Sequence, residues 1–226
     1  MRTTAPAKRA HCSTCLRPQS SCICQWIRPI AHEVEVVILQ HPSEVHQAKG
    51  TARLLHLSLP HSRIVVGEAF APAQLQSLLN QPLTDGATEP APRQAVLLYP
   101  DTPQDPALGL LTPQLLAQDW KADPSRLRLI VLDGTWRESR KMLYLNPLLQ
   151  PLPRLPLHEQ PSSRYLIRKA QCPDQLSTLE ATCAALSQWE DGPEKFQPLL
   201  NAFDGFVAQQ LGYRRTCRRQ HSDEGC

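Results

Sequence analysis

The feature that most constrains the fold is a mostly apolar run, Leu127–Leu132, that ends in Asp133-Gly134-Thr135-Trp136 and continues into a helical pattern, Arg137–Leu149. A buried strand that turns directly into a helix is the building unit of open α/β sheets. Ligands bind where such strands end, because the strand ends leave a crevice and the helix presents unpaired N–H groups. Gly134 suits a tight turn, and Thr135 or Asp133 can cap the helix. A capped helix start without any ligand explains the same four residues.

Further strand and helix patterns alternate along the chain. We expect strands at 33–40, 63–69, 94–99, 126–132 and 152–157, and helices at 48–57, 72–80, 112–120, 137–149, 176–190 and 196–211. This alternation predicts an α/β fold with a mostly parallel sheet flanked by helices. In a parallel sheet the loops 41–51, 99–103 and 133–136 follow strands at one edge, so they can converge on one pocket.

Composition narrows the class of protein. Hydrophobic residues make up 41% and charged residues 20% of the 226 residues, which is typical of a globular protein. No apolar run reaches the about 18 residues that a membrane span needs. The first residues lack the apolar core of a secretory signal. We therefore expect a cytoplasmic protein that does not contact membranes.

Four of the eight cysteines lie within thirteen residues, at Cys12, Cys15, Cys22 and Cys24. A cytosolic chain is unlikely to keep them as disulfides, and four thiolates at this spacing can surround one structural Zn²⁺. A redox-active Cys12–Cys15 pair is the other interpretation, although the second pair lacks that spacing. We expect a zinc-binding segment at 1–30, a catalytic domain at 31–212 and a basic tail at 213–226.

Basic residues gather in clusters although the net charge is only +3. Clusters without interspersed acids suit a polyanionic partner, and solvated helix faces look the same. Glycine-rich nucleotide-binding motifs, the zinc-protease motif and the serine nucleophile elbow do not occur. Candidate chemistry therefore centres on Asp133, on the loop His41-Pro42-Ser43-Glu44 and on Ser162-Ser163-Arg164-Tyr165.

The chain resembles the DTW-domain family of transfer RNA uridine aminocarboxypropyltransferases. Six blocks carry the resemblance in order: the four cysteines, His41-Pro42-x-Glu44 with Lys49-Gly50-Thr51, Leu98-Tyr99-Pro100, Asp133-Gly134-Thr135-Trp136, Ser163-x-Tyr165-Leu166-x-Arg168, and Leu176-Ser177-Thr178-Leu179-Glu180-Ala181. One such block is weak evidence, but six in order across about residues 12–185 are specific. The family's namesake residues correspond to Asp133, Thr135 and Trp136.

The resemblance implies a reaction and a fold. The family is understood to transfer the 3-amino-3-carboxypropyl group of S-adenosylmethionine to N3 of a transfer RNA uridine and to release 5′-methylthioadenosine. The implied fold is akin to the SPOUT methyltransferases, with a knotted sheet. A monomer is the favoured state, and a dimer, common among knotted methyltransferases, stays open.

The implied site residues fall into three groups. Asp133, Thr135 and Trp136 are expected in catalysis, with Asp133 as a general base or as a group that positions the donor's ammonium. Donor binding is expected from His41, Glu44, Leu98, Tyr99, Pro100, Asp133, Ser163, Tyr165 and Thr178. RNA binding is expected from Lys49, Arg53, Arg137, Arg140, Arg164, Arg168 and Lys169.

Several alternatives remain open from the sequence. Trp136 could equally pack in the core, and Ser177 with Glu180 could simply form a capping box. For the whole protein, the alternatives are a SPOUT-type RNA methyltransferase and a zinc-bearing RNA-binding protein without catalysis.

Overall fold

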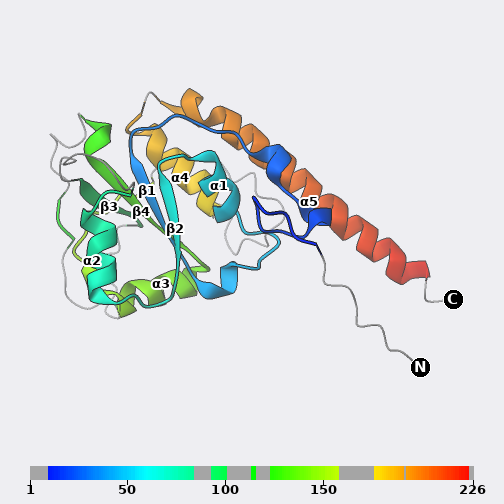
Figure 1. The fold of residues 1–226 in the computed structure, drawn as a ribbon, viewed down its shortest axis with the longest axis horizontal. Coiled ribbons are helices and arrows are strands. Elements are labelled where there is room, and N and C mark those ends of the chain that lie inside the picture. The colour runs from blue at the N-terminus through cyan, green and yellow to red at the C-terminus, as the bar shows by residue number, and fades with distance from the viewer. Residues whose placement is uncertain are drawn as a thin grey trace.

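The computed structural model describes residues 10–83, 93–100, 113–115, 123–157, 176–190 and 192–223. Its centre is a four-stranded parallel sheet in the order β2-β1-β4-β3 (Figure 1). The strands are β1 (Glu35–Gln40), β2 (Ser62–Val66), β3 (Gln94–Leu98) and β4 (Leu127–Asp133). The α/β class and the parallel sheet predicted from the sequence are confirmed. The predicted helix at 112–120 lies mostly outside the described residues.

Helices cover both faces of the sheet (Figure 1). They are α1 (Ala52–Ser58), α2 (Pro72–Asn80), α3 (Trp136–Leu145), α4 (Thr178–Ser187) and α5 (Gln197–Asp223). The last helix continues without a break through residue 213, which was predicted to be the first residue of a basic tail. Within the described residues, no helix combines the length and apolarity needed to cross a membrane.

Alternate residues of the central strands separate the core into two parts. Val36 and Ile38 face α1, α4 and α5, whereas Val37 and Leu39 face α2 and α3. Successive strand side chains point to opposite faces, so a strand covered on both sides must be apolar throughout. This explains why the sequence of β1 shows a continuous apolar run.

The predicted fifth strand at 152–157 is wrong. This segment makes only one bridge, between Arg154 and Leu97 of β3. The Leu97 N–H donates to the Pro153 carbonyl, and the Leu155 N–H donates to the Leu97 carbonyl. Prolines at 151, 153 and 156 supply no N–H groups, so a longer ladder cannot form.

The N-terminal segment packs against the main body of the protein. Ile23 and Cys15 are buried in the same core as α4 and α5. Gly205 of α5 leaves room for the Trp26 ring, because a Cβ at this glycine would meet the ring. The Trp26 indole N–H donates to Gln209 of α5. The segment is therefore joined to the last helix of the chain (Figure 1).

Candidate functional site

The site lies where the two central strands end. Gln40 closes β1 and Asp133 closes β4, and the two residues are partners in the parallel register. The chain leaves β1 toward α1 on one face of the sheet and leaves β4 toward α3 on the other. Loops that leave neighbouring strands in opposite directions open a crevice at this edge, where open α/β sheets bind ligands.

Asp133 is held in one orientation. Its side chain is only 4% exposed. Gln40 Nε2 donates to Oδ2 at 2.8 Å, and Thr178 Oγ1 donates to Oδ1 at 2.6 Å. The geometry therefore presents an oriented carboxylate at the end of the sheet.

A cavity of about 250 Å³ opens beside Asp133. It is lined by Glu44, Gln47, Lys49, Gly50, Thr51, Asp133, Thr135, Ser177 and Thr178. Two of the three loops predicted to converge, the loop after β1 and the turn after β4, meet at this cavity. The start of α4 joins them, although it was not among the loops predicted to converge. Of the third loop, Tyr99 and Pro100 do not line the cavity, and 101–103 lie outside the described residues. Gln40 and Gln47 were not singled out from the sequence, and Gly50, Thr51 and Ser177 were not assigned to the site. Gln40 could have been found as the polar residue that ends an apolar strand.

Helices α3 and α4 both begin at this cavity. Thr135 accepts a hydrogen bond from the Glu138 N–H, and Ser177 accepts one from the Glu180 N–H. Each glutamate in turn accepts from the backbone N–H of its capping residue, which completes two capping boxes. The predicted capping roles of Thr135 and Ser177 are confirmed. Two helix N-termini bring partial positive charge to the cavity wall.

The reason for a glycine at position 134 differs from the predicted one. Gly192 is the glycine with a positive φ in the described part of the chain, so the turn at Gly134 does not require a left-handed conformation. A Cβ at Gly134 would lie 3.1 Å from the Cβ of Glu138 and 3.5 Å from that of His41. The tight contact is the one with Glu138, so the glycine relieves crowding at the start of α3 itself.

Thr51 ties the loop after β1 to α4. It is buried, and its Oγ1 accepts a hydrogen bond from the Leu179 N–H at 3.3 Å. Its side chain makes no capping bond to its own helix α1. The hydroxyl thus joins the start of α1 to the start of α4 behind the cavity.

His41 does not line the cavity and belongs to a network of polar side chains. Its Nδ1 lies 2.7 Å from Ser43 Oγ, and its Nε2 lies 3.0 Å from Glu68 Oε1. Burial opposes ionisation of Glu138, but hydrogen bonds from Ser43 and Thr135 outweigh it and lower the pKa of this carboxyl. Lys141 and then His41 likewise lower the pKa of Glu68. In the described residues, His41 therefore joins the β1 loop to α3.

The predicted aromatic residues lie together outside the cavity lining. Trp136, 46% exposed, stacks on Tyr99 with ring centroids 5.2 Å apart and planes 15° from parallel. The Arg154 guanidinium lies 5.3 Å from the Tyr99 ring centroid. Trp136 is therefore a partly exposed ring on a supported stack and does not pack in the core. Leu98 and Pro100 flank Tyr99 in sequence and do not line the cavity.

The predicted RNA-binding residues are only partly described. Lys49 lines the cavity, and Arg53 donates to the Thr14 carbonyl. Arg137 is exposed and Arg140 half-buried on α3. Outside the described residues lie Ser163, Arg164, Tyr165, Arg168 and Lys169.

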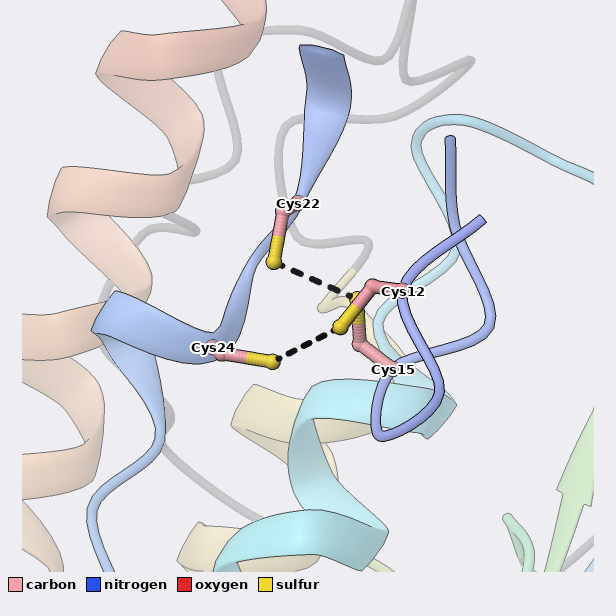
Figure 2. A group of neighbouring side chains, drawn as sticks. All are labelled: Cys12, Cys15, Cys22 and Cys24. Carbon is pink, nitrogen blue, oxygen red and sulfur yellow. Dashed lines mark hydrogen bonds between the residues drawn. The ribbon is translucent and has the colours of Figure 1, made fainter. Parts of the chain in front are cut away.

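The four N-terminal cysteines form one compact cluster with their sulfurs pointing toward one another (Figure 2). The sulfurs of Cys12 and Cys24 are 3.5 Å apart, and those of Cys15 and Cys22 are 3.7 Å apart. A tetrahedral Zn²⁺ with Zn–S bonds of about 2.3 Å sets its sulfurs about 3.8 Å apart. The cluster could therefore hold a metal ion.

The pKa values of the cysteine thiols also bear on whether the cluster can bind a cation. Backbone N–H groups of Cys15 and Thr14 and contact with the Cys24 thiol lower the pKa of Cys12 to about 6. Burial and the neighbouring sulfurs raise the pKa of Cys24 to about 12. One thiolate is thus favoured by the backbone, whereas the charge of a metal ion is needed to keep all four ionised.

Comparisons with known proteins agree with this architecture. A family model for the DTW domain matches residues 9–211. The chain is 31% identical over 214 residues to tRNA-uridine aminocarboxypropyltransferase 2 of Drosophila melanogaster, covering 91% of this chain and 77% of the relative. It is 29% identical over 211 residues to the protein of the same name in Macaca fascicularis, covering 91% and 65%. No solved structure matches. The match across most of its length shows that the chain belongs to the DTW-domain family.

Proposed function

We propose that the protein transfers the 3-amino-3-carboxypropyl group of S-adenosylmethionine to N3 of a uridine in transfer RNA. The names of the curated relatives support the reaction class. The observation that carries the proposal is the oriented carboxylate of Asp133, which faces a cavity at the carboxyl edge of the sheet. In this reaction N3 attacks the γ-carbon and the carbon–sulfur bond breaks. The sulfur keeps the electron pair, N3 gives its proton to solvent water, and methylthioadenosine leaves.

The cavity suits the amino-acid end of the donor. Its volume of about 250 Å³ is below the about 300–1,000 Å³ of sites that enclose a whole drug-sized ligand. Asp133 and Glu44 offer carboxylates for an ammonium group. Lys49 and the N-termini of α3 and α4 offer positive charge for a carboxylate. Thr178 would act both in the donor pocket and in holding Asp133.

Asp133 is proposed as a positioning group. Its two hydrogen bonds fix the orientation of the carboxylate, and a carboxylate held in this way suits binding of an ammonium group. A general base would have to compete with these donors for its own lone pairs. Thr135 is proposed to cap α3 so that the N-terminus of this helix faces the donor.

The uridine and its RNA are proposed to approach from the side of the Tyr99–Trp136 stack. The partly exposed indole suits stacking on a base or contact with the sulfonium. Leu98, Tyr99 and Pro100 would border the adenosine, together with Ser163 and Tyr165. Phosphate contacts are proposed for Lys49, Arg53, Arg137, Arg140, Arg164, Arg168 and Lys169. His41 is proposed to act through the loop after β1.

Five further expectations complete the proposal. The metal is proposed to be a structural Zn²⁺ that holds the N-terminal segment in its fold. The division at residues 30 and 212 is proposed from the sequence, and a knotted SPOUT-like arrangement from the resemblance. Cysteines that are not in disulfides and a transfer RNA substrate both suit the cytoplasm. The protein is proposed to act as a monomer.

One incubation tests the reaction. Purified protein, S-adenosylmethionine and unmodified transfer RNA are combined, and the released nucleoside is identified by chromatography and mass spectrometry. We expect methylthioadenosine, with an aminocarboxypropyl mass added to a uridine. S-adenosylhomocysteine would instead indicate a methyltransferase. Binding of the RNA without any donor turnover would indicate an RNA-binding protein.

A further inference from the structure

The cavity wall depends heavily on one loop, residues 44–51. Glu44, Gln47, Lys49, Gly50 and Thr51 all line the cavity and all belong to this loop. Within it, the Gln47 N–H donates to the Glu44 carbonyl at 3.1 Å, and the Gly50 N–H donates to the Gln47 carbonyl at 2.9 Å. These short-range turns leave other backbone carbonyls of the loop available to outside donors.

Arg17 of the cysteine segment supplies such donors. Its Nη1 donates to the Ala48 carbonyl at 2.6 Å, and its Nη2 donates to the Gly50 carbonyl at 2.8 Å. The two carbonyls flank Lys49, which lines the cavity. A planar guanidinium can hold two acceptors in a fixed geometry, whereas a lysine ammonium is a single point charge. Arg17 thus clamps the loop on both sides of Lys49.

The position of Arg17 is in turn fixed by the cysteine cluster. Arg17 follows Cys15 by two residues, and between them Leu16 adopts a positive φ of 61°. The Leu16 N–H donates to the Cys12 carbonyl, and the Cys12 N–H donates to the Arg17 carbonyl. The Arg17 guanidinium also lies 5.2 Å from the Phe206 ring centroid of α5. A turn closed around Cys12 and Cys15 therefore determines where the guanidinium points.

We infer that Arg17 is a positioning residue through which the four-cysteine cluster holds the donor-pocket loop. It would act through the Ala48 and Gly50 carbonyls, without touching the reacting atoms. The role of the loop in donor binding rests on the proposed function. The mechanical link between the segment and the loop stands on the contacts alone.

The first test follows the loop without any ligand. Millisecond hydrogen exchange is measured on zinc-loaded wild type, Arg17→Gln, Arg17→Lys and Arg28→Gln. Arg28 is a matched control, because among the described residues its guanidinium bonds only to the Gln25 and Ile27 carbonyls of its own segment. In Arg17→Gln we expect the amides of Gln47 and Gly50 to exchange about tenfold faster, while those of β1 and β4 stay unchanged. Arg17→Lys should lie between, and Arg28→Gln should match wild type.

The second test measures donor binding and turnover. Arg17→Gln should bind S-adenosylmethionine about tenfold more weakly by calorimetry, with an unchanged zinc content. Its KM for the donor should rise while kcat stays within about twofold of wild type. Wild-type exchange of the loop, or equal acceleration across the whole chain, would overturn the inference. If wild type itself does not bind the donor, the proposed function fails, and loop exchange still decides the role of Arg17.

Discussion

Buried charged residues have different partners at the two edges of the sheet. At the amino edge, Glu35 of β1 pairs with Arg128 of β4 at 2.5 Å, and both side chains are almost fully buried. Arg128 also donates to the Leu78 and Gln81 carbonyls, so this edge is filled by protein groups. At the carboxyl edge, Asp133 accepts from the neutral side chains of Gln40 and Thr178 and faces a cavity. The same strands thus carry a structural ion pair at one end and a cavity-facing carboxylate at the other.

The largest expected effect comes from breaking the ion pair at the amino edge. Arg128→Met leaves Glu35 as a buried charge without its main partner and should lower the free energy of unfolding by about 3–5 kcal/mol. Urea denaturation measures the loss. The double variant Arg128→Met/Glu35→Gln should recover most of it, because both buried charges are then gone. A folded single variant with wild-type stability would show that the two edges do not differ as described.

Asp133→Asn makes the opposite change at the carboxyl edge. It removes the charge while keeping the shape, so kcat/KM for the donor should fall by about 100-fold or more. Stability should change by only about 1–2 kcal/mol. The control is Asp123→Asn, an exposed aspartate just before the same strand. Wild-type turnover by folded Asp133→Asn would contradict the assignment of this residue.

Thr178→Val separates the orientation of Asp133 from its charge. The variant removes the 2.6 Å hydrogen bond and should lower kcat/KM by about tenfold. Thr182→Val serves as its control, because the buried Thr182 hydroxyl bonds, within the described part of the chain, only the Thr178 carbonyl of the same helix. Equal losses in the two variants would mean that α4 itself was disturbed.

The smallest expected effect is a loss of stability at the amino edge as the pH falls. His32, just before β1, is 2% exposed; its Nδ1 lies 2.8 Å from the Val34 carbonyl, and its Nε2 accepts from the His61 N–H. Burial lowers the pKa of His32 below its usual value, so the neutral form is favoured in the folded state. Its contribution is present above about pH 6.5 and is lost as the pH falls, by at most about 1.4 kcal/mol per pH unit.

Unfolding titrations between pH 7.5 and 5.5 measure that slope. His32→Asn should flatten the curve relative to wild type, whereas the exposed His46→Asn should not. Identical slopes in wild type and His32→Asn would show that His32 does not contribute to the acid sensitivity.

Sequence patterns predicted the fold well where periodicity and burial agree. The bounds of α2 and the apolar strand β1 follow directly from such patterns. The segment 152–157 failed because apolar residues between prolines resemble a strand but lack N–H groups for a ladder. Strand order could not be predicted, since parallel pairing joins residues as distant as Gln40 and Asp133.

The sequence predicted those parts of the site that depend on residues close together in the chain. The cysteine spacing and the cap at Thr135 are encoded within a few residues, and the structure has both. Gln40 is marked locally as a polar residue that ends an apolar strand, and Thr51 stands in a block of the resemblance. Their bonds to Asp133 and Leu179 join distant segments, so these contacts could not be predicted. His41 sits beside the correct strand end, but neighbouring Ser43 and Glu68 determine where its ring points.

The contact between the N-terminal segment and α5 has a consequence for biosynthesis. All four thiols emerge from the ribosome within thirteen residues, so they can capture a metal before most of the chain exists. The helix that packs against this segment, through Gln209 and Gly205, follows all the other described elements in the chain. Until this helix is made, the four-cysteine segment lacks these contacts, so a metal bound early would protect the thiols from oxidation.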